Sequence, residues 1–258
     1  HNGVRPFSGA VDACERVRAA GGTVLLLSNA PRPAASVVQQ LDRIGVSPNA
    51  FDAIVSSGDA ARASIAAAVA AGRSIGHIGP ERDRPLFDGL GARFAALDVA
   101  DIAVCTGLLD DTTETPETYT ATLDGLVDRV IPMICANPDL TVERDGQIVY
   151  CAGAIADAYE KRGGRVVYAG KPHLPIYAMA FETAAKLRGG EVTKERTLAI
   201  GDGIRTDIKG AAAAGVPSVF VASGIHVAAD QPFDAAALDA LFPPGTPRPL
   251  AAMTELAW

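Results

Sequence analysis

Short apolar strands alternate with alanine-rich helices at both ends of this 258-residue sequence. Residues 23–27 form an almost wholly apolar run, which is typical of a strand buried on both faces of a parallel sheet. The segments 10–20 and 33–44 on either side of it have helical spacing, and glycine, a common helix terminator, follows each of them. This alternation predicts βαβ units and therefore an α/β fold built on a parallel sheet.

The same alternation continues before and after the central part of the chain. We predict one more strand and one more helix before the centre, and three strands and two helices after it. The strands are expected at 51–55, 165–169, 197–200 and 218–221, and the helices at 59–71, 176–187 and 207–214.

The central segment, residues 76–150, is more polar than the segments that flank it. Within it, Asp145 and Gly146 lie between two short strand-like runs, 140–143 and 148–150, and this pattern predicts a β-hairpin. Because a hairpin is unusual within a series of parallel crossovers, we predict that this segment is a separate module inserted into the sheet domain.

Composition excludes several classes of partner. The chain is 48% hydrophobic and 21% charged, as in ordinary globular proteins. A net charge of -7 argues against a nucleic acid or an anionic membrane as partner, since both require basic surfaces. No apolar run approaches the roughly 20 residues that span a bilayer, and the first residues do not resemble a signal peptide. We therefore expect a cytoplasmic protein, whose four widely spaced cysteines are buried apolar residues.

Polar residues follow the strand at 23–27. Ser28 and Asn29 come between this strand and the next helix, so a hydroxyl group and free backbone N–H groups lie where an anion would bind. In parallel sheets, ligands bind outside the carboxyl ends of the strands. Serine and asparagine are also common helix caps, and this feature taken alone favours a cap.

Lys171 follows the predicted strand at 165–169 and lies between Gly170 and Pro172. At the carboxyl end of a strand, its ammonium group can balance the charge of a phosphate and of a nearby carboxylate. The alternative is an ordinary solvated lysine after a turn glycine.

Two aspartates follow the strand at 197–200. Asp202 leaves the strand end, and Asp207 begins the next helix five residues later. Two carboxylates directed at one crevice repel each other unless a cation lies between them. Mg²⁺ prefers such oxygen ligands and binds through one or two carboxylates, waters and a substrate phosphate. A turn aspartate followed by a capping aspartate is the alternative. Thr206 replaces the last glycine of a dinucleotide-binding G-x-G-x-x-G pattern, which excludes that reading.

Together these stretches resemble the haloacid-dehalogenase superfamily. The apolar strand ending in Ser28 matches its second motif, Lys171 its third, and Asp202 with Asp207 its fourth. The finer resemblance is to the NagD-like phosphatases of subfamily IIA. It includes residues 136–139 (Ala-Asn-Pro-Asp) and 153–155 (Gly-Ala-Ile), and it extends over nearly the whole chain.

The resemblance implies a Rossmann-like parallel-sheet core with an inserted α+β cap of the C2 type. The expected core comprises residues 1–57 and 166–258, and the expected cap residues 58–165. In such proteins the cap closes over the leaving group of the substrate. Asn137 and Asp139 match the loop that reaches toward the active site and are expected to bind substrate, although a plain Asn-Pro turn is the alternative.

The resemblance also implies an aspartate nucleophile, which is expected upstream of His1. It implies Mg²⁺-dependent hydrolysis of a small phosphomonoester, such as a sugar phosphate or a nucleotide, through an aspartyl-phosphate intermediate. Ser28, Asn29 and Lys171 are the expected catalytic residues, and Asp202 and Asp207 the expected metal site. The alternatives are a phosphoryl transferase or dehalogenase on the same fold and an inactive binding protein. A homodimer is compatible with the resemblance.

Overall fold

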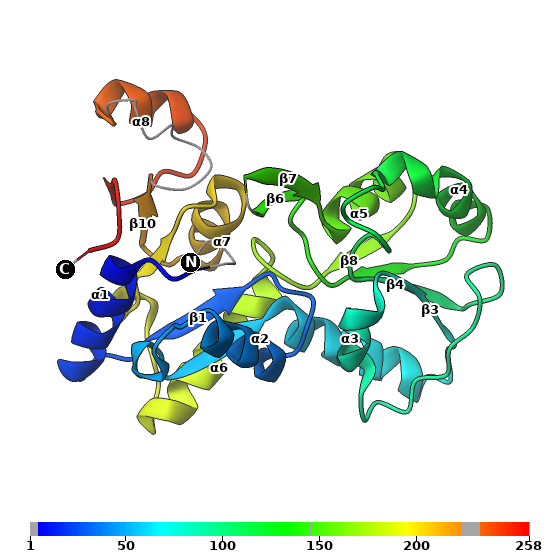
Figure 1. Ribbon diagram of the computed structural model, residues 1–258, viewed down its shortest axis with the longest axis horizontal. Helices are drawn as coiled ribbons and strands as arrows, with labels where there is room; N and C mark the ends of the chain where they lie inside the picture. The colour runs from blue at the N-terminus through cyan, green and yellow to red at the C-terminus, as the bar shows by residue number, and fades with distance from the viewer. Residues whose placement is uncertain (1–4, 145, 223–232, 258) are drawn as a thin grey trace. The chain divides into compact units, whose positions relative to one another are not determined.

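The computed structural model describes residues 5–144, 146–222 and 233–257 of the chain, which form a mixed α/β structure (Figure 1). The described residues divide into two compact units. Unit 1 draws on residues 1–26, 42–53 and 171–258, and unit 2 on residues 27–41 and 54–170. The predicted α/β fold with parallel sheets is confirmed, because the strands of the three-stranded and the four-stranded sheet pair in parallel.

Unit 1 contains a three-stranded parallel sheet with the strand order β11-β10-β9. The central strand, β10, is buried at all four positions, and Phe220 from it packs edge-to-face against Phe242 with ring centroids 5.2 Å apart. The strands are β9 (Ala199–Gly201), β10 (Ser218–Val221) and β11 (Ala251–Met253), and the helices are α1 (Ser8–Ala19), α6 (Leu174–Arg188), α7 (Lys209–Ala214) and α8 (Ala235–Leu241).

Helices α6 and α7 both end where glycine permits a left-handed conformation. Gly189 follows α6 with φ of 67°, and Gly215 follows α7 with φ of 72°. In each case the glycine N–H bonds back to carbonyl groups of the last turn, so the helix end is capped without a strained side chain. The predicted helix at 207–214 forms as a single π turn, η5 (Ile204–Ile208), followed by α7.

Unit 2 contains a four-stranded parallel sheet with the strand order β3-β4-β5-β8. Helices α4 and α5 lie on one side of this sheet and α3 on the other (Figure 1). The strands are β3 (Ile75–Ile78), β4 (Ile102–Cys105), β5 (Met133–Cys135) and β8 (Val166–Tyr168), and the helices are α2 (Ala34–Arg43, of which the last two residues belong to unit 1), α3 (Ser57–Ala70), α4 (Thr120–Asp128) and α5 (Ala152–Lys161).

The predicted hairpin is present in unit 2. Strands β6 (Thr141–Arg144) and β7 (Gln147–Tyr150) pair antiparallel, with Thr141 opposite Tyr150. The strand predicted at 165–169 forms as β8, and it pairs with β5 in the sheet of unit 2. Two further strands, β1 (Leu25–Ser28) and β2 (Ala53–Ser56), form a two-stranded sheet whose residues fall partly in each unit.

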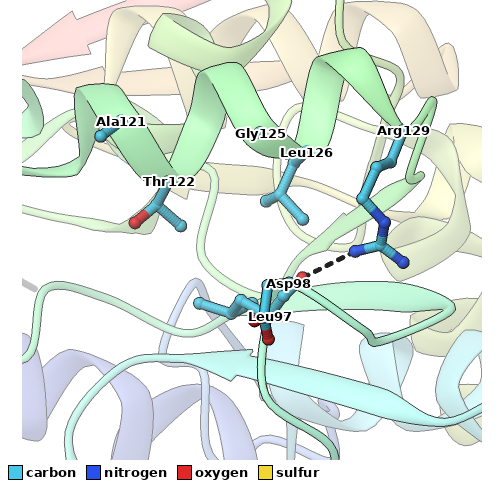
Figure 2. Close-up of a pocket in the computed structure, with 7 residues that line it drawn as sticks. All are labelled: Leu97, Asp98, Ala121, Thr122, Gly125, Leu126 and Arg129. Carbon is cyan, nitrogen blue, oxygen red and sulfur yellow. Dashed lines mark hydrogen bonds between the residues drawn. The ribbon is translucent and has the colours of Figure 1, made fainter.

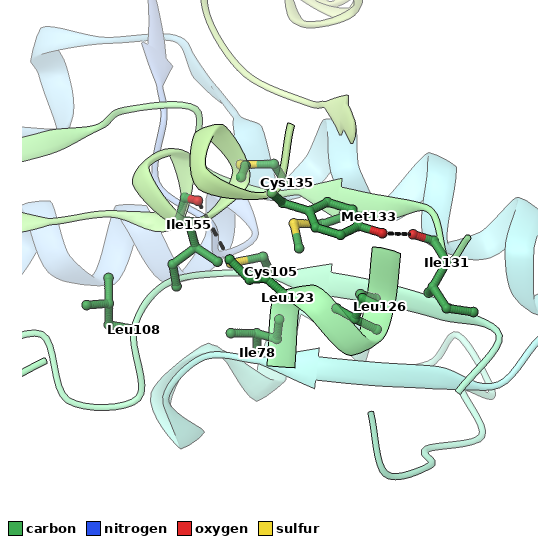
Figure 3. Packing of buried hydrophobic residues seen from close by; sticks show 13 residues of the cluster. Ile78, Cys105, Leu108, Leu123, Leu126, Ile131, Met133, Cys135 and Ile155 are labelled. Carbon is green, nitrogen blue, oxygen red and sulfur yellow. Dashed lines mark hydrogen bonds between the residues drawn. The ribbon is translucent and has the colours of Figure 1, made fainter. Parts of the chain in front are cut away.

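The core of unit 2 lies between its sheet and helices α4 and α5 (Figure 3). Side chains that alternate along β4 and β5 point to this face, and Cys105 and Cys135 are direct neighbours on the two strands. Leu123 from α4 and Ile155 from α5 cover them and are completely buried. Burying each such side chain contributes about 1.5–3 kcal/mol, so this layer fixes the sheet whose loops are described below.

None of the helices in the described ranges combines the length and the apolar character needed to cross a lipid bilayer. The four cysteines are free. Cys105, Cys135 and Cys151 are buried, as the sequence predicts, whereas Cys14 is only partly buried, against the prediction.

Candidate active site

Lys171 and Asp207 form an ion pair in unit 1. Lys171 Nζ lies 2.7 Å from Asp207 Oδ1, and the two side chains are only 14% and 17% exposed. The other carboxylate oxygen of Asp207 accepts a hydrogen bond of 3.0 Å from the backbone N–H of Gly203. Both oxygens of this carboxylate therefore have a donor within the protein, and Asp207 is held in a fixed orientation.

The glycines on either side of Asp202 give the Asp207 side chain its space. A Cβ atom on Gly201 would lie 2.3 Å from Asp207 Cγ, and one on Gly203 would lie 2.1 Å from the Thr206 hydroxyl oxygen. The Gly-Asp-Gly sequence is thus a steric requirement of the strand end. Asp202 itself lies between the two glycines, directly after β9, and its side chain is exposed.

Tyr177 of α6 packs beside this ion pair. Its hydroxyl donates a 3.5 Å hydrogen bond to the backbone carbonyl of Asp207, and burial together with the Asp207 charge raises the pKa of the Tyr177 phenol. A Cβ on Gly210 would lie 2.3 Å from the Tyr177 hydroxyl oxygen. The neutral phenol therefore fixes the backbone of the η5 turn that carries Asp207.

The predicted residues of unit 2 form a second group. Asn29 Nδ2 donates a 2.8 Å hydrogen bond to Asp139 Oδ1, and the backbone N–H of Asp139 donates one of 3.0 Å to Asn137 Oδ1. Asn29 and Asn137 are 6% and 9% exposed. The Ser28 hydroxyl accepts a 3.1 Å hydrogen bond from the backbone N–H of Ala30. The structure thus brings Asn29, Asn137 and Asp139 together across 110 residues of sequence.

Close backbone approaches surround the loop at Asn137. A Cβ on Gly153, at the start of α5, would lie 2.3 Å from the carbonyl oxygen of Pro138. A Cβ on Gly170, the residue before Lys171, would lie 2.5 Å from Asn29 Oδ1 and 2.7 Å from the Ser57 hydroxyl oxygen. Both positions therefore require glycine, because a side chain at either one would displace the Asn137 loop or Asn29.

The loops after β3 and β4 carry charged residues that the sequence did not single out. Asp83 is 3% exposed, and Asp111 accepts hydrogen bonds from two arginines. In the sequence, Asp111 belongs to the polar run at 110–117, and such a run is equally typical of a surface loop. The partners of Asp111 lie 29 and 33 residues away, so spacing gave no indication of the pairing.

A surface hollow of unit 2 lies away from the residues of this site. It has a volume of about 350 Å³ and lies between α4 and the loop at Leu97 and Asp98 (Figure 2). Arg129 borders it and donates to the carbonyl oxygens of Leu97 and Ala100. These residues precede β4 and β5, at the opposite edge of the sheet from the loop at Asn137, and the chemistry that the sequence predicts is not found there.

The donors of unit 1 fit a hard divalent cation. Asp202 offers an exposed carboxylate at a strand end, and Mg²⁺ needs only one or two carboxylates because waters and phosphate complete its coordination. Asp207 already binds Lys171 and Gly203, which suits it to orienting neighbours. Among the described residues, no three His, Cys, Asp or Glu side chains cluster as a closed metal site would require.

Two family models match this chain. One, described as haloacid dehalogenase-like hydrolase, matches residues 1–93, and the other, described as HAD-hydrolase-like, matches residues 168–243. The structure is similar to that of a haloacid dehalogenase-like hydrolase from Brucella suis 1330, with 43% sequence identity, a TM-score of 0.89, and coverage of 100% of this chain and 92% of that one. The chain belongs to the haloacid dehalogenase-like hydrolase family.

Two phosphatases extend the comparison within this hydrolase family. A glycerol phosphate phosphatase from Mycobacterium tuberculosis, solved with magnesium, shares 26% identity and a TM-score of 0.71, covering 98% of this chain and 70% of that one. A 4-nitrophenylphosphatase from Thermotoga maritima shares 23% identity and a TM-score of 0.70, covering 97% and 88%, and supports the fold alone. No curated protein sequence matches this chain. The predicted family and the prediction of a hydrolytic enzyme are confirmed.

Proposed function

We propose that this hydrolase is a Mg²⁺-dependent phosphatase that acts on a small phosphomonoester. The observation that carries the proposal is the ion pair of Lys171 and Asp207, anchored by Gly203 next to the exposed carboxylate of Asp202. This arrangement supplies one cation for phosphoryl oxygens and one carboxylate for a metal ion. The glycerol phosphate phosphatase with bound magnesium supports the same reaction class.

Each predicted residue has a role in this proposal. Asp202 would hold Mg²⁺, which supplies charge stabilisation to the transferring phosphoryl group when bound. Asp207 orients the Lys171 ammonium group, and Lys171, Ser28 and Asn29 bind phosphoryl oxygens. The nucleophile that forms the aspartyl-phosphate remains a prediction for the segment upstream of His1.

Unit 2 would supply substrate selection. Asn137 and Asp139 lie on the loop after β5, and the hydrogen bond from Asn29 to Asp139 joins that loop to the segment after β1. We propose that residues 58–165 act as the cap and residues 1–57 and 166–258 as the core. Under this proposal the Asn137 loop contacts the substrate next to its phosphoryl group.

The test is release of inorganic phosphate from a panel of phosphomonoesters, with and without Mg²⁺, by protein that includes the residues preceding His1. Magnesium-dependent release supports the proposal. Asp202→Asn should abolish that release and weaken Mg²⁺ binding measured by calorimetry, because it removes the carboxylate charge while keeping the side-chain shape. Full magnesium-dependent turnover by the Asn variant would remove Asp202 from the metal site, and phosphate transferred to an acceptor in place of release would indicate a transferase.

A further inference from the structure

One buried hydroxyl group of unit 2 has no hydrogen-bond partner. Ser57, the first residue of α3, is 0% exposed. Among the residues that the structure describes, its Oγ is the one buried side-chain oxygen or nitrogen without a partner. Leaving a buried hydroxyl unsatisfied costs free energy, and native structures seldom do so. The position of this hydroxyl therefore requires an explanation other than stability.

Helix capping does not explain the Ser57 hydroxyl. The N-cap of α3 is Ser56, whose hydroxyl accepts a 3.0 Å hydrogen bond from the backbone N–H of Asp59 and donates one of 2.8 Å to the Asp59 carboxylate. The capping box of α3 is therefore complete without Ser57. Ser74, a second buried serine of this unit, shows the usual state, because its hydroxyl lies 2.6 Å from Asp101 Oδ2 and donates to it.

The Ser57 hydroxyl lies close to the side-chain amide of Asn29. A Cβ on Gly170 would lie 2.7 Å from Ser57 Oγ, 2.5 Å from Asn29 Oδ1 and 2.8 Å from Pro138 Cδ, so both oxygens border the same space in front of the Gly170 α-carbon. All of these residues belong to unit 2. A hydroxyl is a donor and an amide oxygen accepts up to two hydrogen bonds, so the two groups are chemically complementary.

Backbone contacts hold the two residues near each other. The Gly58 N–H donates a 3.0 Å hydrogen bond to the Ala30 carbonyl, which joins the first turn of α3 to the loop after β1. A Cβ on Gly58 would lie 2.5 Å from the carbonyl oxygen of Arg32, so helix and loop are in close contact. Ser57 and Asn29 each adjoin this contact. Rotation of their side chains, with the backbone in place, therefore changes which groups they meet.

We propose that Ser57 is a positioning residue, whose hydroxyl donates a hydrogen bond to Asn29 Oδ1 when a phosphoryl group is bound. The inference rests on the proposed function, in which Asn29 binds phosphoryl oxygens. In this structure Asn29 Nδ2 donates to Asp139 Oδ1 at 2.8 Å. To bind an anion, the amide must present N–H and keep its partly negative oxygen turned away. A donor at Oδ1 favours that orientation.

The first experiment replaces Ser57 with Ala in protein that includes the residues preceding His1. With 4-nitrophenyl phosphate and Mg²⁺, we expect kcat to fall about tenfold, the effect of one hydrogen bond lost in the transition state. The melting temperature should stay the same or rise, because the hydroxyl has no partner to lose. Ser74→Ala is the matched control. It removes the hydroxyl bonded to Asp101 and should lower the melting temperature by about 2–4 °C, with kcat and KM unchanged.

A double-mutant cycle tests whether Ser57 acts through Asn29. Asn29→Ala should lower kcat, and adding Ser57→Ala to that variant should change kcat by less than about twofold, because no amide remains to be oriented. Calorimetric binding of inorganic phosphate in the presence of Mg²⁺ provides a readout without turnover. Its affinity should weaken in Ser57→Ala, stay unchanged in Ser74→Ala, and weaken no further when Ser57→Ala is added to Asn29→Ala.

Three results would overturn the role of Ser57 and leave the phosphatase function in place. They are unchanged kcat and phosphate affinity in Ser57→Ala, additive losses in the double variant, and a fall in melting temperature as large as that of Ser74→Ala. Coupled losses in phosphate binding by a protein that releases no phosphate would support the role of Ser57 and reject the phosphatase function alone. An unchanged protein that neither binds nor releases phosphate would reject both.

Discussion

Lys171 and Asp207 are joined by a 2.7 Å ion pair that is largely shielded from solvent. The second oxygen of Asp207 is bound by the Gly203 N–H, so this carboxylate has little freedom to rotate toward another partner. The ammonium group of Lys171 is therefore held next to a carboxylate that is itself fixed in place. The pair therefore pre-organises a positive charge, and charge stabilisation by pre-organised groups is a large contribution to catalysis in phosphoryl transfer.

Replacing Asp207 with Asn should remove most activity and reduce stability. Lys171 would remain mostly buried without its counter-charge, which costs about 2–3 kcal/mol given that the pair retains some exposure. Phosphate release should fall about 100-fold or more, since loss of one oriented donor has effects of that size. Chemical denaturation and a phosphate assay measure the two effects.

The matched control for this prediction is the double variant Lys171→Met with Asp207→Leu. Replacing both partners by apolar groups should recover most of the stability lost in Asp207→Asn while leaving the protein inactive. An Asp207→Asn variant with unchanged activity would show that the ion pair has no catalytic role.

Replacing Gly153 with Ala should disturb the Asn137 loop. The new methyl group would lie 2.3 Å from the Pro138 carbonyl oxygen and 2.5 Å from that of Asp139, and backbone atoms cannot move aside cheaply. We expect a loss of about 1–3 kcal/mol in the free energy of unfolding and a higher KM for substrate, because Asp139 would shift from Asn29. Thermal unfolding and steady-state kinetics measure these effects.

Gly125→Ala is the matched control for this substitution. Gly125 lies in α4 of the same unit, and an added Cβ there meets nothing within 4 Å. Because alanine favours the helix, this variant should be more stable by about 0.5–1 kcal/mol, with unchanged KM. A Gly153→Ala protein as stable as the unchanged protein would mean that the Asn137 loop tolerates displacement.

The contrast between β1 and β3 shows which part of the fold could be predicted from sequence. The predicted strand at 23–27 is nearly all apolar, and it forms β1. Gly76 and His77 interrupt the apolar pattern of β3, and the strand was not predicted. Gly76 is required by packing, since a Cβ there would lie 2.7 Å from a Leu97 methyl group. The local sequence pattern around Gly76 does not reveal this contact with Leu97, which lies in a different part of the chain.

In the candidate site, too, some residues could be predicted from the sequence and others could not. Lys171 and Asp207 could be named because each follows a recognisable strand and strand ends collect ligands. The grouping of Arg82, Arg144 and Asp111 could not be predicted. Arg82 and Asp111 lie in segments that connect strands, Arg144 ends strand β6, and their pairing depends on how the strands are ordered in the sheet. The sequence contains the residues, but their neighbours are determined by tertiary packing.

The buried cysteines should resist thiol reagents in the folded protein. Burial raises the pKa of Cys105 to about 12 and that of Cys151 to about 12, and it raises the pKa of Cys135 well above its ordinary value. Only the thiolate reacts, so these three thiols should be modified no faster than the protein unfolds. Timed reaction with a disulfide reagent, with and without denaturant, measures this. Rapid modification of three thiols in the native protein would contradict the packing of unit 2 (Figure 3).

His77 should make stability fall in mildly acidic solution. Burial, aided by the Arg84 charge, lowers the pKa of His77 from 6.5 to about 4, and its Nε2 lies 2.9 Å from the Thr106 hydroxyl. Between these two pKa values the unfolded chain binds a proton that the folded protein does not, so the free energy of unfolding decreases as pH falls from about 6.5 to about 4. The raised pKa of the Asp83 carboxyl group also contributes to the pH dependence of stability. The measured quantity is therefore the difference in the free energy of unfolding between the unchanged protein and His77→Gln. The difference in the free energy of unfolding between the two proteins should diminish as pH falls, because histidine takes up a proton on unfolding and glutamine does not ionise. A difference that stays constant between pH 7 and pH 4 would mean that His77 titrates alike in the folded and unfolded states.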